Sequence, residues 1–254
     1  MTKNVLKAHA AILLANLCWG INSPVTKSVL MEGSISPIAL SAIRIGGASL
    51  LFLLLGLFLP QSVAPREKIA RADIWKIVAA SMLMISANQG LYIIGIGFTN
   101  PIDSAVMCSV TPLLTMILAV VMGMAGVIML VWGNRAGATA TNPVLGDLLC
   151  LGAQMAAALY YVLFMGLIER YHPFTLMKWM FYISALTYVP LCLPELIDAD
   201  YAAVSVSGWG GIAFIIVFGT VLSYLAIPYA QRWLKPTVVS IYNYLQPVAA
   251  AVVA

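Results

Sequence analysis

Apolar runs long enough to cross a bilayer follow one another along almost the whole chain, and this feature limits the fold more than any other. A membrane span needs about 20 mostly apolar residues. Backbone groups find no partners in hydrocarbon, so a span is either a helix or a strand of a closed barrel. The runs are roughly 18 to 25 residues long and lack the two-residue alternation of barrel strands. We therefore expect an all-α membrane protein, a multi-span helical bundle.

Composition excludes a soluble domain. Hydrophobic residues make up 62% of the chain and charged residues 9%, whereas an ordinary soluble domain carries about 25% charged residues. The net charge of +4 comes from basic residues scattered over short loops, so nucleic-acid binding is not expected. The four cysteines lie far apart in apolar runs without a CxxC pair, which predicts small core residues and no metal site.

The runs predict spans and an orientation. We expect spans at 9–30, 36–59, 74–98, 102–121, 145–168, 173–193, 209–230 and 236–254, with a short apolar piece at 122–133. Basic loop residues stay on the cytoplasmic side, which places the N-terminus in the cytoplasm and the protein in the cell (inner or plasma) membrane. Every later loop obeys this rule if 102–133 crosses twice. As one helix, however, this stretch would be about 48 Å long, too long for one upright span and too short for two. Both counts stay open.

Proline spacing indicates an internal repeat. Asn100-Pro101 and Lys235-Pro236 each open a span, and each is followed by a second proline, Pro112 or Pro247. Ser36-Pro37 and His172-Pro173 open earlier spans at nearly the same offset. The first repeat would cover 1–133 and lack residues between its fourth and fifth spans, and the second would cover 144–254 and stop after its fourth span. Two repeats of five spans insert in opposite senses, so the expected fold is two inverted repeats, ancestrally 5+5 and here about eight or nine spans.

Several short segments carry a resemblance to a known family. In the first half they are Trp19-Gly20-Ile21-Asn22 with Lys27, Ser36-Pro37 with Arg44, and Thr111-Pro112-Leu113-Leu114. In the second half they are Gly146-Asp147-Leu148-Leu149, Gly219-Thr220 with Tyr224, and Leu245-Gln246-Pro247-Val248. In order and spacing the chain resembles the EamA-type drug/metabolite transporters, which are ten-helix proteins of two five-helix repeats. The family's acidic residue after the fourth span and its tenth span have no counterpart here.

Arg44 is the strongest candidate for a functional residue. It lies about 12 Å into its span, where a charge is costly and commonly faces the bundle interior or a water-filled cavity. The functional interpretation is a cation that lines the path of a substrate with an anionic group. The alternative is a structural arginine bonded to helix carbonyls. Lys27, near the end of its span, is expected to reach the membrane interface by snorkelling.

Other polar and aromatic side chains within spans are candidates for the same path. The full set that we expect to line it is Trp19, Asn22, Arg44, Gln89, Tyr92, Tyr160, Tyr224, Tyr242 and Gln246. For each of them, helix packing or an interhelical hydrogen bond is the alternative. Pro112 and Pro247 are hinge candidates, because proline removes a helical hydrogen bond, and static kinks are their alternative.

These features lead to two functional hypotheses. The first is a secondary transporter that exports small organic metabolites or drugs by alternating access. The second is a non-transporting, truncated or remnant membrane protein of the same family. No catalytic motif is present, so we expect no enzyme activity, no cofactor and no metal. The expected partners are the lipid bilayer and an amino-acid-like or aromatic small molecule, with proton or ion coupling and a homodimer left open.

Overall fold

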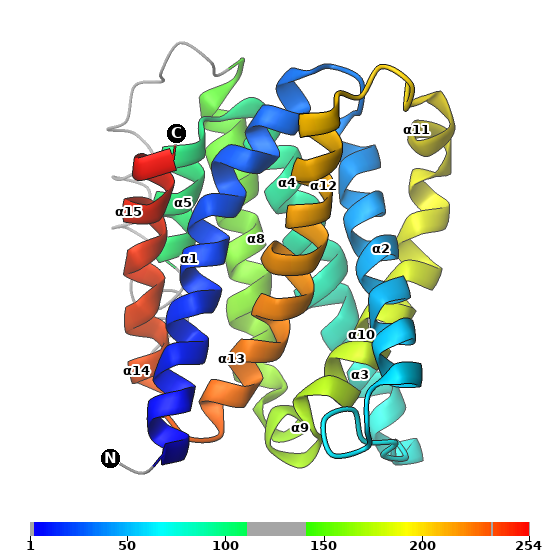
Figure 1. Cartoon of the computed structure of the whole chain (residues 1–254), viewed down its shortest axis with the longest axis vertical. Helices are drawn as coiled ribbons and strands as arrows, with labels where there is room; N and C mark the ends of the chain where they lie inside the picture. The colour runs from blue at the N-terminus through cyan, green and yellow to red at the C-terminus, as the bar shows by residue number, and fades with distance from the viewer. Residues whose placement is uncertain (1–2, 111–140, 235, 254) are drawn as a thin grey trace.

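A computed structural model describes residues 3–110, 141–234 and 236–253, and it shows an all-helical bundle without strands in these ranges (Figure 1). In chain order the elements are α1 (Lys3–Met31), α2 (Pro37–Phe58), the 3-10 turn η1 (Arg71–Asp73), α3 (Ile74–Ser81), the π-helix η2 (Met82–Ala87), α4 (Asn88–Phe98), α5 (Pro101–Ser109), α8 (Pro143–Leu163), α9 (Met165–Arg170), α10 (Pro173–Tyr188), the 3-10 turn η3 (Val189–Cys192), α11 (Leu193–Asp198), α12 (Val206–Ile216), the π-helix η4 (Val217–Leu222), α13 (Ser223–Gln231), α14 (Pro236–Ile241), the 3-10 turn η5 (Tyr242–Tyr244) and α15 (Leu245–Val253). Within the described ranges, 6 helical stretches are long and apolar enough to cross a membrane. The predicted multi-span helical bundle is confirmed.

Polar residues followed by proline set where several helices begin. Ser36 and Asn100 are N-cap residues, and each precedes a proline in the first turn. The Ser36 hydroxyl accepts a hydrogen bond from the Ala39 N–H at 3.1 Å, and the Asn100 side chain accepts one from the Asp103 N–H at 2.9 Å. Such caps satisfy N–H groups that have no partner within the helix, and proline fits the first turn because it has no N–H to satisfy.

Corresponding helices of the two halves run in opposite directions. In Figure 1, α1 rises and α8 descends, α2 descends and α10 rises, α3–α4 rise and α12–α13 descend, and α5 descends while α14–α15 rise. The two π-helices, η2 and η4, begin 135 residues apart at matching places in the two halves. These relations are those of two inverted repeats.

Charges separate between the two ends of the bundle. One end, at the bottom in Figure 1, holds Arg66, Lys68, Arg71, Arg170 and Arg232, and we call it the basic end. Acidic residues lie there too, among them Asp73, which pairs with Arg170 and Lys76. The opposite end holds Glu32, Glu195, Asp198 and Asp200, and its described loops contain no lysine or arginine; we call it the acidic end. Which end faces the cytoplasm stays a prediction from these charges.

Both α5 and α8 begin at the acidic end of the bundle. The Asn142 N–H donates to the Phe98 carbonyl at 3.3 Å, so the start of α8 lies beside the end of α4. The number of crossings in 102–133 depends on residues 111–140 and stays a prediction. Residues 111–140, with Pro112 and the apolar piece at 122–133, lie outside the described residues.

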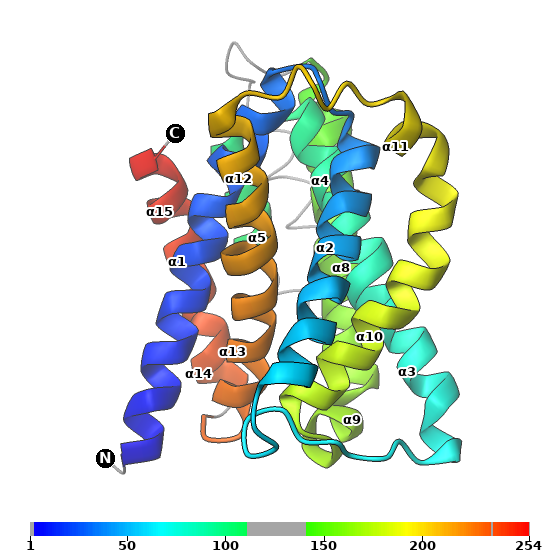
Figure 2. The same ribbon diagram turned by 45° about the vertical axis from the view of Figure 1, so that its right-hand side comes forward.

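Small residues allow the tightest helix contacts. A Cβ on Gly95 of α4 would lie 2.8 Å from the Gly146 carbonyl of α8, so these two helices meet backbone to backbone. Phe52 of α2 packs against Phe174 and Phe181 of α10, and Figure 2 shows the two helices side by side. Without a hydrophobic driving force between helices in lipid, such close packing holds a bundle together.

Candidate functional site

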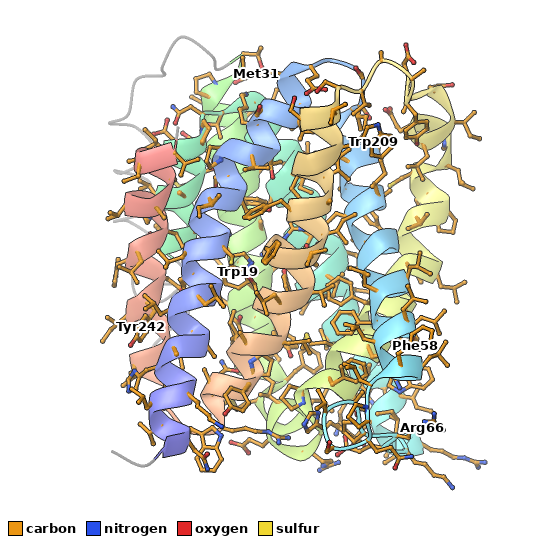
Figure 3. The ribbon with its side chains drawn as sticks, viewed as in Figure 1. Trp19, Met31, Phe58, Arg66, Trp209 and Tyr242 are labelled. Atoms are coloured by element: carbon orange, nitrogen blue, oxygen red, sulfur yellow. The ribbon has the colours of Figure 1, made fainter. Side chains whose placement is uncertain are left out.

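A cavity of about 340 Å³ lies in the middle of the bundle, between helices of both halves. Seven of the nine residues predicted to line a substrate path line it: Trp19, Asn22, Arg44, Gln89, Tyr92, Tyr224 and Gln246. Figure 3 shows Trp19 at mid-height in the bundle. These residues come from α1, α2, α4, α13 and α15, so the cavity depends on the packing of the two halves.

Arg44 reaches from α2 to the π-helix η4, and it is only 3% exposed. Its Nε donates to Thr220 Oγ1 at 2.6 Å, and its Nη2 donates to the Gly219 carbonyl at 3.1 Å. Its Nη1 is buried without a hydrogen-bond partner. The guanidinium is therefore fixed by two bonds while one nitrogen remains available on a residue that lines the cavity.

The backbone carbonyl that accepts a hydrogen bond from Arg44, that of Gly219, lies in the π-helix η4. A π-helix shifts the backbone pairing by one residue, and such segments are frequent at functional sites. The Gly219 carbonyl accepts both from Arg44 and from the indole Nε1 of Trp19, at 2.9 Å. Asn22 packs directly against Gly219: a Cβ built on this glycine would overlap Asn22 Oδ1. Glycine is therefore the residue that lets α1 approach η4 so closely.

Further polar groups surround this arginine. The hydroxyls of Ser23 and Tyr92 are 2.5 Å apart, which ties α1 to α4. Tyr224 donates to Asn88 Oδ1 at 3.1 Å, and Asn88 Nδ2 donates to the Ala153 carbonyl at 2.7 Å. Asn22 Oδ1 is buried and makes no hydrogen bond of normal geometry. Buried polar groups without partners are rare in folded proteins, and Asn22 and Arg44 carry such groups on residues that line the cavity.

Gln246 closes one side of the cavity from α15. Its Nε2 donates to Asn16 Oδ1 of α1 at 2.8 Å. The next residue, Pro247, lies in the first turn of α15, directly after the 3-10 turn η5 that interrupts the α14–α15 span. A hinge at this interruption stays a prediction.

Two predicted residues do not line the cavity. Tyr160 is 1% exposed and packs in the core between Tyr161 and Phe164. Tyr242 lies on the flank of the bundle (Figure 3), where its hydroxyl is 2.8 Å from His9 Nδ1. The prediction was wrong in placing them at the cavity, because a helix turns each residue by about 100° and the sequence does not fix which face points inward.

Other cavity residues were missing from the predicted set. Cys108 was expected to be a small core residue, yet it lines the cavity, where Gln154 Nε2 donates to its Sγ at 3.2 Å. Gln154, Asn88 and Gln231 also line the cavity. An amide side chain within a span can be recognised in the sequence as a candidate cavity residue, whereas nothing in the sequence distinguishes Cys108 from the other cysteines.

The cavity extends from mid-height toward the basic end. Its lining includes Met165 of α9, Gln231 at the end of α13 and Val239 of α14, all near that end. Toward the acidic end it stops at Asn22, Arg44 and Tyr92. Among the described residues, no aspartate or glutamate lines the cavity, and no group of three His, Cys, Asp or Glu could hold a metal ion. A cavity with one buried arginine and no acidic side chain suits an anionic ligand.

The chain is similar to a known protein family, to a curated protein and to solved structures. The model of the EamA-like transporter family matches residues 6–131 and 144–254. An uncharacterized transporter of Bacillus subtilis (strain 168), YyaM, is 22% identical over 237 residues, which cover 87% of this chain and 77% of that protein. A crystal structure that is 17% identical superposes with a TM-score of 0.65 and covers 100% of this chain and 90% of its own. At this identity the last match supports the fold alone.

Proposed function

This chain belongs to the EamA-like transporter family, and we propose that it exports small organic solutes with an anionic group by alternating access. As a transporter-family protein with several membrane-spanning helices, it lies in a lipid bilayer. The substrate class, the direction and the mechanism are the new elements of the proposal.

The observation that carries the proposal is the unpaired Nη1 of Arg44. Thr220 and Gly219 hold the other side of the guanidinium, so the group is already oriented before a ligand binds. A carboxylate or phosphate would complete its hydrogen bonds and neutralise a charge that no acidic residue of the lining compensates. A neutral ligand would leave that charge buried, which is costly.

The remainder of the lining favours an organic ligand. Trp19, Tyr92, Tyr161, Tyr224 and Met84 offer aromatic and soft apolar surface. Pockets for small molecules commonly combine such surface with a few polar groups and have volumes of about 300–1,000 Å³. The cavity, at about 340 Å³, is at the small end of this range. These properties support an amino-acid-like or aromatic metabolite.

The direction of transport is proposed from the charges. If the basic end faces the cytoplasm, as the distribution of basic loops indicates, the N-terminus is cytoplasmic and the cavity fills from the cytoplasm. Loading from this side is what an exporter in the cell membrane requires. Proton or ion coupling and a homodimer stay predictions from the sequence.

The test is flux of small organic anions through vesicles that contain the purified protein. Arg44→Ala should lower flux about tenfold to a hundredfold, because a hydrogen bond to a charged group is worth about 1.5–3 kcal/mol. Arg66→Ala, which removes an exposed arginine at the basic end, is the control and should transport normally. Both variants must reach the membrane in equal amount.

Two results would count against the proposal. Normal flux in Arg44→Ala would remove the role assigned to the arginine. If the unaltered chain moves no organic anion and binds none in detergent, the alternative hypothesis of a non-transporting member of the family becomes the better one.

A further inference from the structure

At the acidic end, α1 is bonded to α4 by two sets of contacts above the cavity. The Ser23 and Tyr92 hydroxyls are 2.5 Å apart. One turn further, Lys27 Nζ donates to the carbonyls of Ile96 at 3.2 Å and of Gly97 at 2.9 Å. Lys27 is 6% exposed, so the prediction that it snorkels to the interface was wrong. A buried ammonium bonded to the last carbonyls of α4 also suits the negative end of that helix dipole.

The inverted repeat supplies a counterpart for each of these residues at the basic end. If the two family matches are aligned from their first residues, 6 and 144, Ser23 and Lys27 of the first half pair with Tyr161 and Met165 of the second. Both Tyr161 and Met165 line the cavity. The helix face that is closed against α4 in the first half therefore borders open space in the second half.

The residues of α4 in this contact also have counterparts that line the cavity. Because η2 and η4 begin 135 residues apart, Tyr92 and Ile96 correspond to Ile227 and Gln231. These two residues also line the cavity. Gln231 Oε1 is buried and has no hydrogen-bond partner. All four counterparts of the closed contact at the acidic end thus lie on the open cavity at the basic end.

We propose that these two symmetry-related sets are the gates of the transporter. Ser23, Lys27 and Tyr92 hold the acidic gate closed in this structure. In the alternate state α1 parts from α4 and α8 closes on α13, where the Tyr161 hydroxyl donates to Gln231 Oε1. The two gates differ in chemistry, because a lysine bonded to carbonyls holds one and a tyrosine bonded to an amide holds the other. The inference rests on the proposed alternating access and adds the gating residues.

The test measures from which side Cys108 can be reached, independently of transport. Cys18, Cys150 and Cys192, which are buried away from the cavity, are replaced by alanine, so Cys108 is the reporter. A membrane-impermeant maleimide is added to either face of membrane vesicles, and the rate of labelling is measured. This reference protein should be labelled faster from the basic end.

Weakening one gate should move access toward the other face. Lys27→Met, which copies the counterpart Met165, should raise labelling from the acidic end about tenfold, because it removes hydrogen bonds of a charged group. Gln231→Leu, added to this variant, should lower that rate severalfold, since it removes the acceptor that stabilises the alternate state. Lys178→Met is the matched control: Lys178 is half-buried on α10, away from both gates, and should leave both rates unchanged.

Unchanged labelling from the acidic end in Lys27→Met would overturn the gate assignment. The same follows if Gln231→Leu raises that rate instead of lowering it. Flux on the same vesicles separates the two proposals. If the protein transports organic anions but Lys27→Met leaves the labelling of Cys108 unchanged, the gates are rejected and the proposed transport stands. If labelling moves to the other face but no organic anion is transported, the gates are supported and the proposed function is contradicted.

Discussion

The two π-helices occupy matching places in the inverted halves, yet they meet different side chains. In one junction, α2 packs against η4 (Val217–Leu222), and Arg44 bonds to Thr220 and Gly219. In the other, α10 packs against η2 (Met82–Ala87). Counted from Pro37 and Pro173, which open α2 and α10, the residue that matches Arg44 is Met180. The first junction lines the cavity through Arg44, whereas Met180 is fully buried and does not line it.

The apolar junction packs into the core, and of its residues Met84 also lines the cavity. Met180 clusters with Met84 and Ile85 of η2, and its carbonyl accepts a hydrogen bond from Ser81 Oγ at 2.7 Å. A π-helix therefore holds a charged side chain beside the cavity in one half and packs against an apolar side chain in the other. The repeat supplies the helix geometry, and a few side chains decide which junction can bind a ligand. Three substitutions test this comparison.

The largest effect is expected from Met180→Arg, which puts the charge into the apolar junction. Met84 and Ile85 offer no side-chain oxygen there, and an uncompensated buried charge costs several kcal/mol. We expect the yield of monodisperse protein from membranes to fall to near zero. Met180→Leu, which keeps the volume, should be recovered at the normal level. Normal yield of Met180→Arg would mean that the two junctions are interchangeable.

A smaller effect is expected from Gly219→Ala in the polar junction. The added Cβ would lie 2.3 Å from Asn22 Oδ1, so α1 or η4 must shift. Such overpacking costs about 1–3 kcal/mol, which should appear as a lower melting temperature of the purified protein. Gly210→Ala on α12 is the control, because its Cβ would meet nothing within 4 Å. Equal melting of the two variants would contradict the close approach described here.

The smallest effect on folding is expected from Arg44→Lys. Lysine keeps the charge but lacks the planar fork that reaches Thr220, Gly219 and a ligand together. We expect thermal stability within about 1 kcal/mol of the unaltered protein and a loss of anion affinity of about tenfold, measured by ligand titration. Affinity that is unchanged would show that charge alone, and not the guanidinium geometry, selects the ligand.

Part of the site could be predicted from single residues. Arg44 could be predicted because burying a charge deep in a span costs free energy unless the charge faces a water-filled cavity or a bonding partner. Gln89 and Asn22 were identified by the same reasoning about polar groups in hydrocarbon. The reasoning failed for Tyr160 and Tyr242, since tyrosine is stable in a core, at an interface or at a cavity, and its position depends on how its helix is rotated.

The helical, membrane-spanning nature of the chain, the separation of its charges and the offset between its halves could all be predicted from the amino-acid sequence. These properties depend on local composition and on spacing, because the bilayer requires every span to satisfy its own backbone. The contacts between helices distant in sequence could be learned from the tertiary structure alone: Arg44 meets a π-helix 175 residues away, Cys108 lines the cavity, and α1 is bonded to α4 near the acidic end. These features depend on how helices distant in sequence pack, and the energy of each contact depends on partners that no local segment contains.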